Sequence, residues 1–200
     1  MKIGVFGGSF DPIHNGHLRI AENAFAEAGL DSLLFMPVYM QPFKIGKTMC
    51  APARRLEMLR LALQGKPEFS VTGVELRERG VSYTIHSLRT IRAQSPADAE
   101  IYFLLGADML LMLEKWKLAA ELLREFSFIV AARPGSDSVE PFAAYLSDTY
   151  GTRILHMKNE LLDVSSSDIR EKVRQGKKIR GLVPKAVEEY IYENGMYKDA

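Results

Sequence analysis

The chain reads Gly7-Gly8-Ser9-Phe10-Asp11-Pro12-Ile13-His14-Asn15-Gly16-His17 near its amino terminus. The apolar run at residues 2–6 in front of this stretch is typical of a buried strand. Apolar residues behind it recur at helical spacing, at Leu18, Ile20, Ala21, Ala24, Phe25 and Ala28. The sequence therefore predicts a strand, a glycine turn and a helix in direct succession, which is the beginning of an α/β fold.

This turn has the composition of an anion site. Gly7 and Gly8 remove side chains where the backbone must come close to a ligand, and Gly16 keeps the entrance of the helix open. The free N–H groups and the positive dipole end of the helix favour phosphate oxygens. His14 and His17 stand one helical turn apart, so both imidazoles can donate hydrogen bonds to one phosphate group. We predict a phosphate site here and no metal site.

Three similar motifs are excluded by their spacing. A dinucleotide-binding turn needs G-x-G-x-x-G and an acidic residue after the second strand, but residues 4–9 read Gly-Val-Phe-Gly-Gly-Ser and that strand ends near Met36-Pro37. The G-x-S-x-G nucleophile elbow fails because its last glycine is Asp11. Gly46-Lys47-Thr48 resembles the end of a P-loop, yet the glycine required five residues earlier is Gln41.

Composition limits the remaining function classes. The 200 residues, 47% of them hydrophobic, suffice for a single domain over residues 1–200. A formal net charge of +1 gives no support for binding to nucleic acid or to a membrane surface. Cys50 is the only cysteine, which excludes an internal disulfide and fits a cytoplasmic protein. The longest apolar runs, such as residues 33–40, are too short to span a bilayer.

Strand-like and helical segments alternate along the rest of the chain. The expected strands are residues 33–36, 69–72, 101–105, 126–130 and 153–156. The expected helices are residues 53–63, 84–93, 118–125, 139–150, 165–175 and 184–194. This order predicts a doubly wound, mainly parallel sheet and a helical C-terminal portion at about residues 165–200. Ligands of such sheets bind beyond the carboxyl ends of the strands.

A second candidate phosphate clamp follows the last expected strand. Residues 165–168 read Ser-Ser-Ser-Asp and fit a capping box, so a purely structural interpretation explains the serines. It does not explain Arg170, because a cation is unfavourable near a helix N-terminus unless an anion is present. Ser167 and Arg170 are three residues apart and share one face of the helix.

For several other candidate residues the sequence allows both a ligand-binding and a structural interpretation. Trp116 stands between two lysines, as a stacking platform would, although a lone tryptophan is usually a core residue. Asp108 follows a strand and either binds a ribose hydroxyl or caps the next helix, and Arg133 either reaches the site or is a solvated turn charge. Residues 39–51, which contain Lys44, form either a mobile basic lid or a solvated loop.

Two motifs together resemble the paired signature of the nucleotidyltransferases that share an HxGH turn. They are Gly8-x-Phe10-Asp11-Pro12-x-His14-x-Gly16-His17 and Ser165-Ser166-Ser167-x-Ile169-Arg170. Within that group the chain resembles the bacterial nicotinate-nucleotide adenylyltransferases over nearly its whole length, through Glu75-Leu76, residues 79–84, Gly106-Ala107-Asp108, Trp116, Arg133-Pro134-Gly135 and residues 183–197. The chain departs from the family in Phe43 before Lys44, where a histidine is frequent, in His86, where an aspartate is frequent, and in Ser167, where a threonine is frequent.

The resemblance implies a Rossmann-like nucleotidyltransferase fold and a condensation of ATP with nicotinate mononucleotide on the route to NAD, with Mg²⁺ carried by the ATP phosphates. It implies catalytic roles for His14, His17 and Arg170. The implied ATP-binding residues are Gly8, Ser9, Phe10, Gly16, Gly106, Asp108, Ser167 and Ile169. The implied nicotinate mononucleotide-binding residues are Lys44, Tyr83, Thr84, Trp116 and Arg133. Homodimers are common among related enzymes, and the sequence leaves the oligomeric state open.

Two rival functions stay open at this point. One is a related adenylyltransferase that acts on phosphopantetheine, against which the Ser82-Tyr83-Thr84 segment, Trp116 and Ile169-Arg170 argue. The other is a nucleotide sensor without activity, against which the intact histidine turn and Arg170 argue. We interpret His86 and His156 as structural, because neither falls within the predicted phosphate site.

Overall fold

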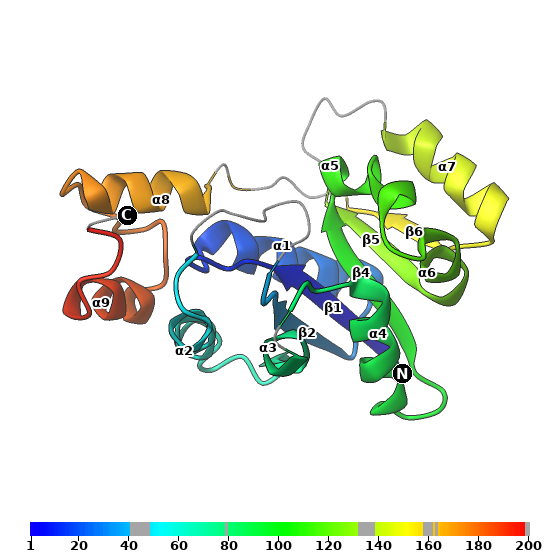
Figure 1. The fold of residues 1–200 in the computed structure, drawn as a ribbon, viewed down its shortest axis with the longest axis horizontal. Coiled ribbons are helices and arrows are strands. Elements are labelled where there is room, and N and C mark those ends of the chain that lie inside the picture. The colour runs from blue at the N-terminus through cyan, green and yellow to red at the C-terminus, as the bar shows by residue number, and fades with distance from the viewer. Residues whose placement is uncertain (41–48, 79, 132–138, 158–161, 163, 199–200) are drawn as a thin grey trace.

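Strand β1 (Lys2–Gly8) lies inside a parallel sheet whose strand order is β3-β2-β1-β4-β5-β6 (Figure 1). The computed structural model describes residues 1–200 except 41–48, 79, 132–138, 158–161, 163 and 199–200. The other strands are β2 (Ser32–Pro37), β3 (Phe69–Val71), β4 (Glu100–Gly106), β5 (Ser127–Ala131) and β6 (Ile154–His156). The predicted doubly wound parallel sheet is confirmed, and each expected strand is present within two residues of its expected ends.

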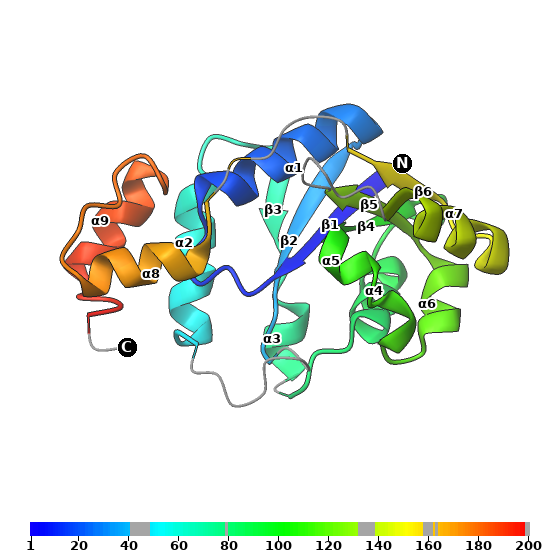
Figure 2. The ribbon, with the colours of Figure 1, turned by 90° about the horizontal axis from the view of Figure 1, so that it is seen from above.

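The helices connect these strands and cover both faces of the sheet (Figures 1 and 2). They are α1 (Asn15–Ala28), α2 (Pro52–Ala62), α3 (Val74–Glu78), α4 (Thr84–Ala93), α5 (Ala107–Leu110), α6 (Ala119–Glu125), α7 (Val139–Tyr150), α8 (Ser166–Arg174) and α9 (Lys185–Glu193), with a 3₁₀ turn η2 (Leu113–Lys115). The expected helices are confirmed. The short elements α3, α5 and η2 were not predicted, because three to five residues are too few to show a helical period.

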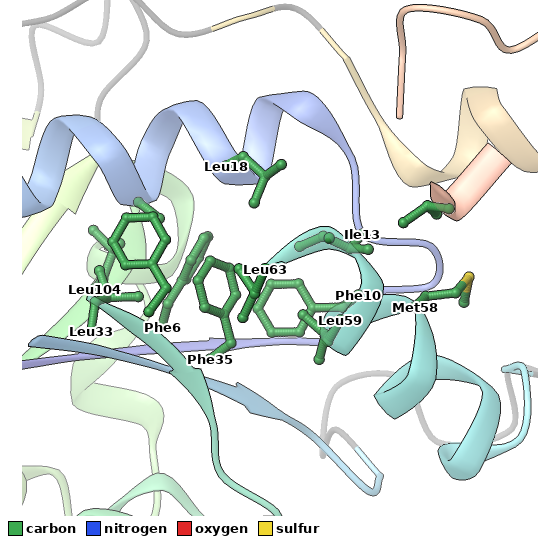
Figure 3. Packing of buried hydrophobic residues seen from close by; sticks show 14 of the residues in the cluster. Phe6, Phe10, Ile13, Leu18, Leu33, Phe35, Met58, Leu59, Leu63 and Leu104 are labelled. Carbon is green, nitrogen blue, oxygen red and sulfur yellow. The ribbon is translucent and has the colours of Figure 1, made fainter. Parts of the chain in front are cut away.

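Alternate residues of β1 supply the two apolar cores. Phe6 belongs to the first core, which includes residues of α1, α2, α8 and α9, whereas its neighbour Val5 belongs to the second core, which includes residues of α4, α6 and α7. This alternation is expected because successive side chains of a strand point to opposite faces of the sheet. Figure 3 shows aromatic and aliphatic side chains of the first core between α1 and the sheet.

The helical C-terminal portion packs against the side of the sheet that carries α2. Figures 1 and 2 both place α8 and α9 beside α2 and far from α6 and α7. Val173 of α8 and Val187 of α9 are buried in the first core together with residues of β1 and β2. The prediction of a helical C-terminal portion is confirmed.

The strand order reverses between β1 and β4, which creates a crevice at the carboxyl edge of the sheet. β1 ends at Gly8 and β4 ends at Gly106, and the two strands pair in parallel from Lys2 with Glu100 to Phe6 with Leu104. In doubly wound folds ligands bind at this reversal point. Among the described residues there is no helix with the length and apolar character needed to traverse a bilayer.

Candidate active site

The two histidines of the turn form a stacked pair at the start of α1. His14 is the N-cap of α1, and its Nδ1 accepts a hydrogen bond from the backbone N–H of His17 at 3.2 Å. The two rings stack with their centroids 3.6 Å apart and an interplanar angle of 25°. Because Nδ1 of His14 is an acceptor, a neutral His14 carries its proton on Nε2 and keeps that N–H as a donor.

Both imidazoles are neutral near pH 7. Burial lowers the pKa of His14 from 6.5 to about 4. Burial, and then the neighbouring His14, hold the pKa of His17 well below its ordinary value. The pair can therefore donate hydrogen bonds to an anion, while the positive potential has to come from the helix dipole and from other side chains.

Packing within the turn explains two of its glycines. A Cβ atom on Gly8 would lie 2.9 Å from the ring of Phe10, and a Cβ on Gly16 would lie 3.0 Å from Nδ1 of His14. Phe10 has φ 46°, is 1% exposed, and its ring lies edge-on to His17 with the centroids 5.1 Å apart. These glycines leave room for the side chains that hold the histidine pair. The sequence pattern instead suggested close approach of a ligand for Gly8 and an open helix entrance for Gly16.

Arg170 reaches the histidine turn from the other end of the chain. Its Nη1 donates to the carbonyl oxygen of Asp11 at 2.6 Å, and its Nη2 donates to Oγ of Ser167 at 3.3 Å. Ser166 Oγ donates to the carbonyl oxygen of Pro12 at 2.9 Å. Ser165 is the N-cap of α8, as the capping-box pattern predicted, since its Oγ accepts from the backbone N–H of Asp168 at 3.1 Å. The reciprocal half of the box differs, because the Asp168 carboxylate accepts from Ser165 Oγ at 2.7 Å. The two motifs therefore converge in one place.

Two cavities lie at the carboxyl edge of the sheet. The His14 cavity has about 240 Å³ and is lined by His14, Gly16, Gly106 and Asp108, among others. The Trp116 cavity has about 220 Å³ and is lined by Gly8, Tyr83, Thr84 and Trp116, among others. Phe6, Leu105 and Gly106 line both cavities, so the cavities are neighbours across the ends of β1 and β4. One extended ligand can therefore occupy both.

The Trp116 cavity combines an apolar wall with a helix N-terminus. Trp116 is half-buried, and its ring lies edge-on to Phe103 with the centroids 6.1 Å apart. Trp116 thus packs on the second core and also lines the cavity. Its role as a stacking platform for a ligand stays a prediction. Tyr83 is the N-cap of α4 and Thr84 begins it, as expected for a site that favours an anion.

A larger groove opens beside Arg170. The Arg170 groove has about 790 Å³, and its lining includes Arg54, Arg170, Arg174, Ser167 and Cys50. Arg174 is paired with Glu171, and its Nε donates a hydrogen bond to Oε2 of Glu171 at 2.9 Å. Within the described part of the chain, Arg170 donates hydrogen bonds only to neutral oxygen atoms, so its charge remains available to an anionic ligand.

The side chains of several predicted site residues are not in a position to contact a ligand directly, or lie outside the described residues. The side chains of Phe10 and Ile169 are 1% and 0% exposed, so any contact they make with ATP comes from their backbone. Ser9 Oγ is buried and has no hydrogen-bond partner among the described residues.

Asp108 is exposed in the first turn of α5. The N-cap of that helix is Gly106, which makes no side-chain hydrogen bond, so Asp108 does not cap it. Lys44 and Arg133 lie outside the described residues.

Sequence reasoning missed a buried polar group beneath the turn. Asp11 is 3% exposed, and Oδ1 of its carboxylate accepts a hydrogen bond from the hydroxyl of Tyr197 at 2.7 Å. Arg55 is fully buried and donates to the carbonyl oxygens of Ser9 and Cys50 at 2.8 and 3.1 Å. Asp11 stands inside the quoted motif, but no spacing in the sequence connects it to Arg55 or Tyr197.

Comparison with known proteins gives consistent matches. A family described as cytidylyltransferase-like matches residues 5–172. A probable nicotinate-nucleotide adenylyltransferase of Exiguobacterium sibiricum is 40% identical over 197 residues, which cover 98% of this chain and 99% of that protein. One of Dehalococcoides mccartyi, with the same name, is 38% identical over 199 residues, covering 98% of this chain and 97% of that protein.

The fold agrees with a solved structure. The nicotinic acid mononucleotide adenylyltransferase of Plasmodium falciparum, complexed with NaAD, superimposes with a TM-score of 0.79 at 18% sequence identity. The match covers 98% of this chain and 97% of that one. At this identity the likeness establishes the fold, which is the Rossmann-like nucleotidyltransferase fold that the sequence predicted.

Proposed function

Because the chain belongs to the nicotinate-nucleotide adenylyltransferases, within the cytidylyltransferase-like family, we propose that it transfers the adenylyl group of ATP to nicotinate mononucleotide. The products are deamido-NAD and pyrophosphate, on the route to NAD. The observation that carries the proposal is the convergence of the stacked His14–His17 pair and Arg170 on one turn at the reversal point of the sheet.

The chemistry needs positioning and charge stabilisation. A phosphate oxygen of nicotinate mononucleotide attacks the α-phosphorus of ATP in line, and a new P–O bond forms. The bond between the α-phosphorus and the bridging oxygen breaks, and its electron pair leaves with pyrophosphate. The attacking phosphate is already ionised near neutral pH, so neither a general base nor a covalent nucleophile is required.

The donors of the turn stabilise the charge that builds up on the phosphate oxygens. His14 and His17 donate hydrogen bonds to the ATP phosphates as neutral imidazoles and stabilise the crowded α-phosphorus in the transition state. Arg170 and Ser167 bind the β and γ phosphates, which become the leaving pyrophosphate. The N-terminus of α1 adds the positive end of its helix dipole.

The Trp116 cavity takes nicotinate mononucleotide in this proposal. The pyridine ring stacks on Trp116, and the N-terminus of α4 at Tyr83 and Thr84 receives the nicotinate carboxylate. The residues that line both cavities support a position of this nucleotide next to the phosphates of ATP. The contacts of Lys44 and Arg133 remain predictions from the family resemblance.

We assign Mg²⁺ to the triphosphate oxygens of ATP, where the ion would neutralise part of the charge of the leaving group. The donor set fits such an ion, because imidazole and guanidinium N–H groups bind phosphate oxygens and leave the others to the metal. No cluster of three or more histidine, cysteine, aspartate or glutamate side chains suitable for a metal occurs in the described part of the chain. The cytoplasmic location and the homodimer remain predictions.

A pyrophosphate-release assay tests the proposal. The purified protein is incubated with Mg²⁺-ATP and, in parallel, with nicotinate mononucleotide, with phosphopantetheine or with no second substrate. Release only with nicotinate mononucleotide, together with deamido-NAD in the product mixture, is the expected result. Release with phosphopantetheine instead would favour the related adenylyltransferase. ATP binding without release in any mixture would favour a nucleotide sensor.

A further inference from the structure

Asp11 joins three parts of the chain that are far apart in the sequence. Its carboxylate accepts two hydrogen bonds, at Oδ1 from the hydroxyl of Tyr197 at 2.7 Å and at Oδ2 from the backbone N–H of Cys50 at 3.0 Å. Its carbonyl oxygen accepts the hydrogen bond from Arg170 at 2.6 Å. One buried residue thus holds the C-terminal tail, the segment before α2 and the functional arginine of α8.

The hydroxyl of Tyr197 is well suited to hold this carboxylate. Burial, and then the Asp11 charge, raise the pKa of Tyr197 far above its ordinary value, so the hydroxyl keeps its proton and donates. The residue has φ 63°, in the left-handed region that residues other than glycine seldom adopt. Figures 1 and 2 show the chain leaving α9 and passing beside α8.

The placement of Arg170 relative to the histidine turn depends on Asp11. Ser167 lies on the same helix as Arg170, so their hydrogen bond moves with the helix. The bond to the Asp11 carbonyl is the described contact that ties the guanidinium of Arg170 to the turn itself. Tyr197 supplies one of the two hydrogen bonds that hold the Asp11 carboxylate, the other coming from the Cys50 N–H, so loss of the Tyr197 bond would let the Asp11 carbonyl shift.

We propose that Tyr197 is a positioning residue for adenylyl transfer. Its hydroxyl fixes the Asp11 carboxylate, and the Asp11 carbonyl then holds the Arg170 guanidinium against the triphosphate of ATP. This inference rests on the proposed function. It differs from a purely structural role, in which Tyr197 only anchors the tail and affects stability.

Tyr197→Phe tests it, because the substitution keeps the ring and removes only the hydroxyl. Tyr192→Phe is the matched control, since the hydroxyl of Tyr192 accepts the Ile179 N–H at 3.3 Å and does not contact Asp11. We expect Tyr197→Phe to lower kcat/KM for ATP about 10-fold or more, the scale at which a displaced catalytic group acts. The KM for nicotinate mononucleotide should stay within about twofold, because the Trp116 cavity is untouched. Tyr192→Phe should leave both unchanged.

A double mutant separates positioning from stability. If Tyr197 acts through Arg170, Tyr197→Phe should have no further effect in an Arg170→Gln background. Effects that multiply, or equal losses with both substrates, would overturn the proposal, as would wild-type efficiency of Tyr197→Phe. Asp11→Asn gives a second route, since it disturbs the same junction and should also impair ATP selectively.

Binding of a non-hydrolysable ATP analogue, measured by calorimetry, keeps this inference separate from the proposed function. Absence of pyrophosphate release by the wild-type protein would contradict the proposed function alone. The positioning role would still be supported if Tyr197→Phe weakened analogue binding and Tyr192→Phe did not. Equal analogue affinity in wild type and Tyr197→Phe would contradict it.

Discussion

The histidine pair and the Arg170 clamp meet at one turn but are built in different ways. His14 and His17 are positioned by local structure, because the cap of α1, the ring stacking and Gly16 all lie within a few residues of one another. Arg170 is positioned by contacts across 159 residues, through the carbonyl oxygen of Asp11. In the proposed mechanism, a locally encoded donor pair and a donor held by tertiary structure therefore act on the same ATP molecule.

The two parts also differ in charge. Burial keeps the histidines neutral, so they offer directed hydrogen bonds without net charge. Arg170 is half-buried and brings a full positive charge at the edge of a large groove. We infer a division of labour in which the histidines recognise the reacting phosphate and Arg170 attracts and holds the leaving group.

The largest effect is expected for the histidine pair. His17→Ala should lower kcat by about 100-fold to 1000-fold, which is typical when one preorganised donor of a transition state is removed. Steady-state pyrophosphate release and thermal unfolding measure activity and fold together. His156→Gln is the control, since His156 lies in β6 and lines none of the three described cavities named above. Near-normal turnover of folded His17→Ala would refute the division of labour.

Arg170→Gln should weaken ATP binding by about 30-fold, within the range for hydrogen bonds to charged groups. Affinity for nicotinate mononucleotide should be unchanged. Arg174→Gln is the matched control, because it removes the same charge from the same helix and groove, but from a residue already paired with Glu171. Equal losses in the two variants would show that the groove acts by general positive charge and that Arg170 is no specific clamp.

Much of the fold and of the histidine turn could be predicted from the sequence, because the sequence patterns that indicate them are local. The glycine turn, the N-cap at Ser165 and the start of α4 at Thr84 are all short-range patterns, and the structure contains each of them. The alternation of strands and helices likewise predicted the parallel sheet. The strand order of the sheet was not predicted, because the pairing of β1 with β4 depends on tertiary packing between segments far apart in the sequence.

The parts that escaped prediction depend on long-range packing. The bond from Tyr197 to Asp11 spans 186 residues, and nothing in the spacing of either residue indicates it. The short helices α3 and α5 owe their stability to buried residues such as Val74 and Leu110 in the second core. Trp116 was expected in a polar setting, yet its Nε1 is buried without a partner among the described residues.

The acceptor side should show a smaller effect than either phosphate-binding part. We expect kcat/KM to be about 10-fold higher for nicotinate mononucleotide than for nicotinamide mononucleotide, because a carboxylate gains more than a neutral amide from N–H groups at the start of α4. Competition between the two substrates in one reaction, with product quantified by chromatography, measures this ratio directly. Equal efficiencies would remove the N-terminus of α4 as the basis of selectivity.

The smallest expected effect is on the free energy of unfolding. Its pH dependence should distinguish the histidine pair from Arg170. An unfolded histidine binds a proton below about pH 6.5, whereas folded His14 does so only near pH 4, so the unfolded state holds more protons between these values. The free energy of unfolding should therefore fall as the pH drops from 6.5 to 5.5, by about 1 kcal/mol from His14 alone. Urea unfolding at several pH values should show this loss reduced by that amount in His14→Gln and unchanged in Arg170→Gln. The same loss in all three proteins would mean that His14 is not held neutral by burial, and the contrast in charge between the two parts would fail.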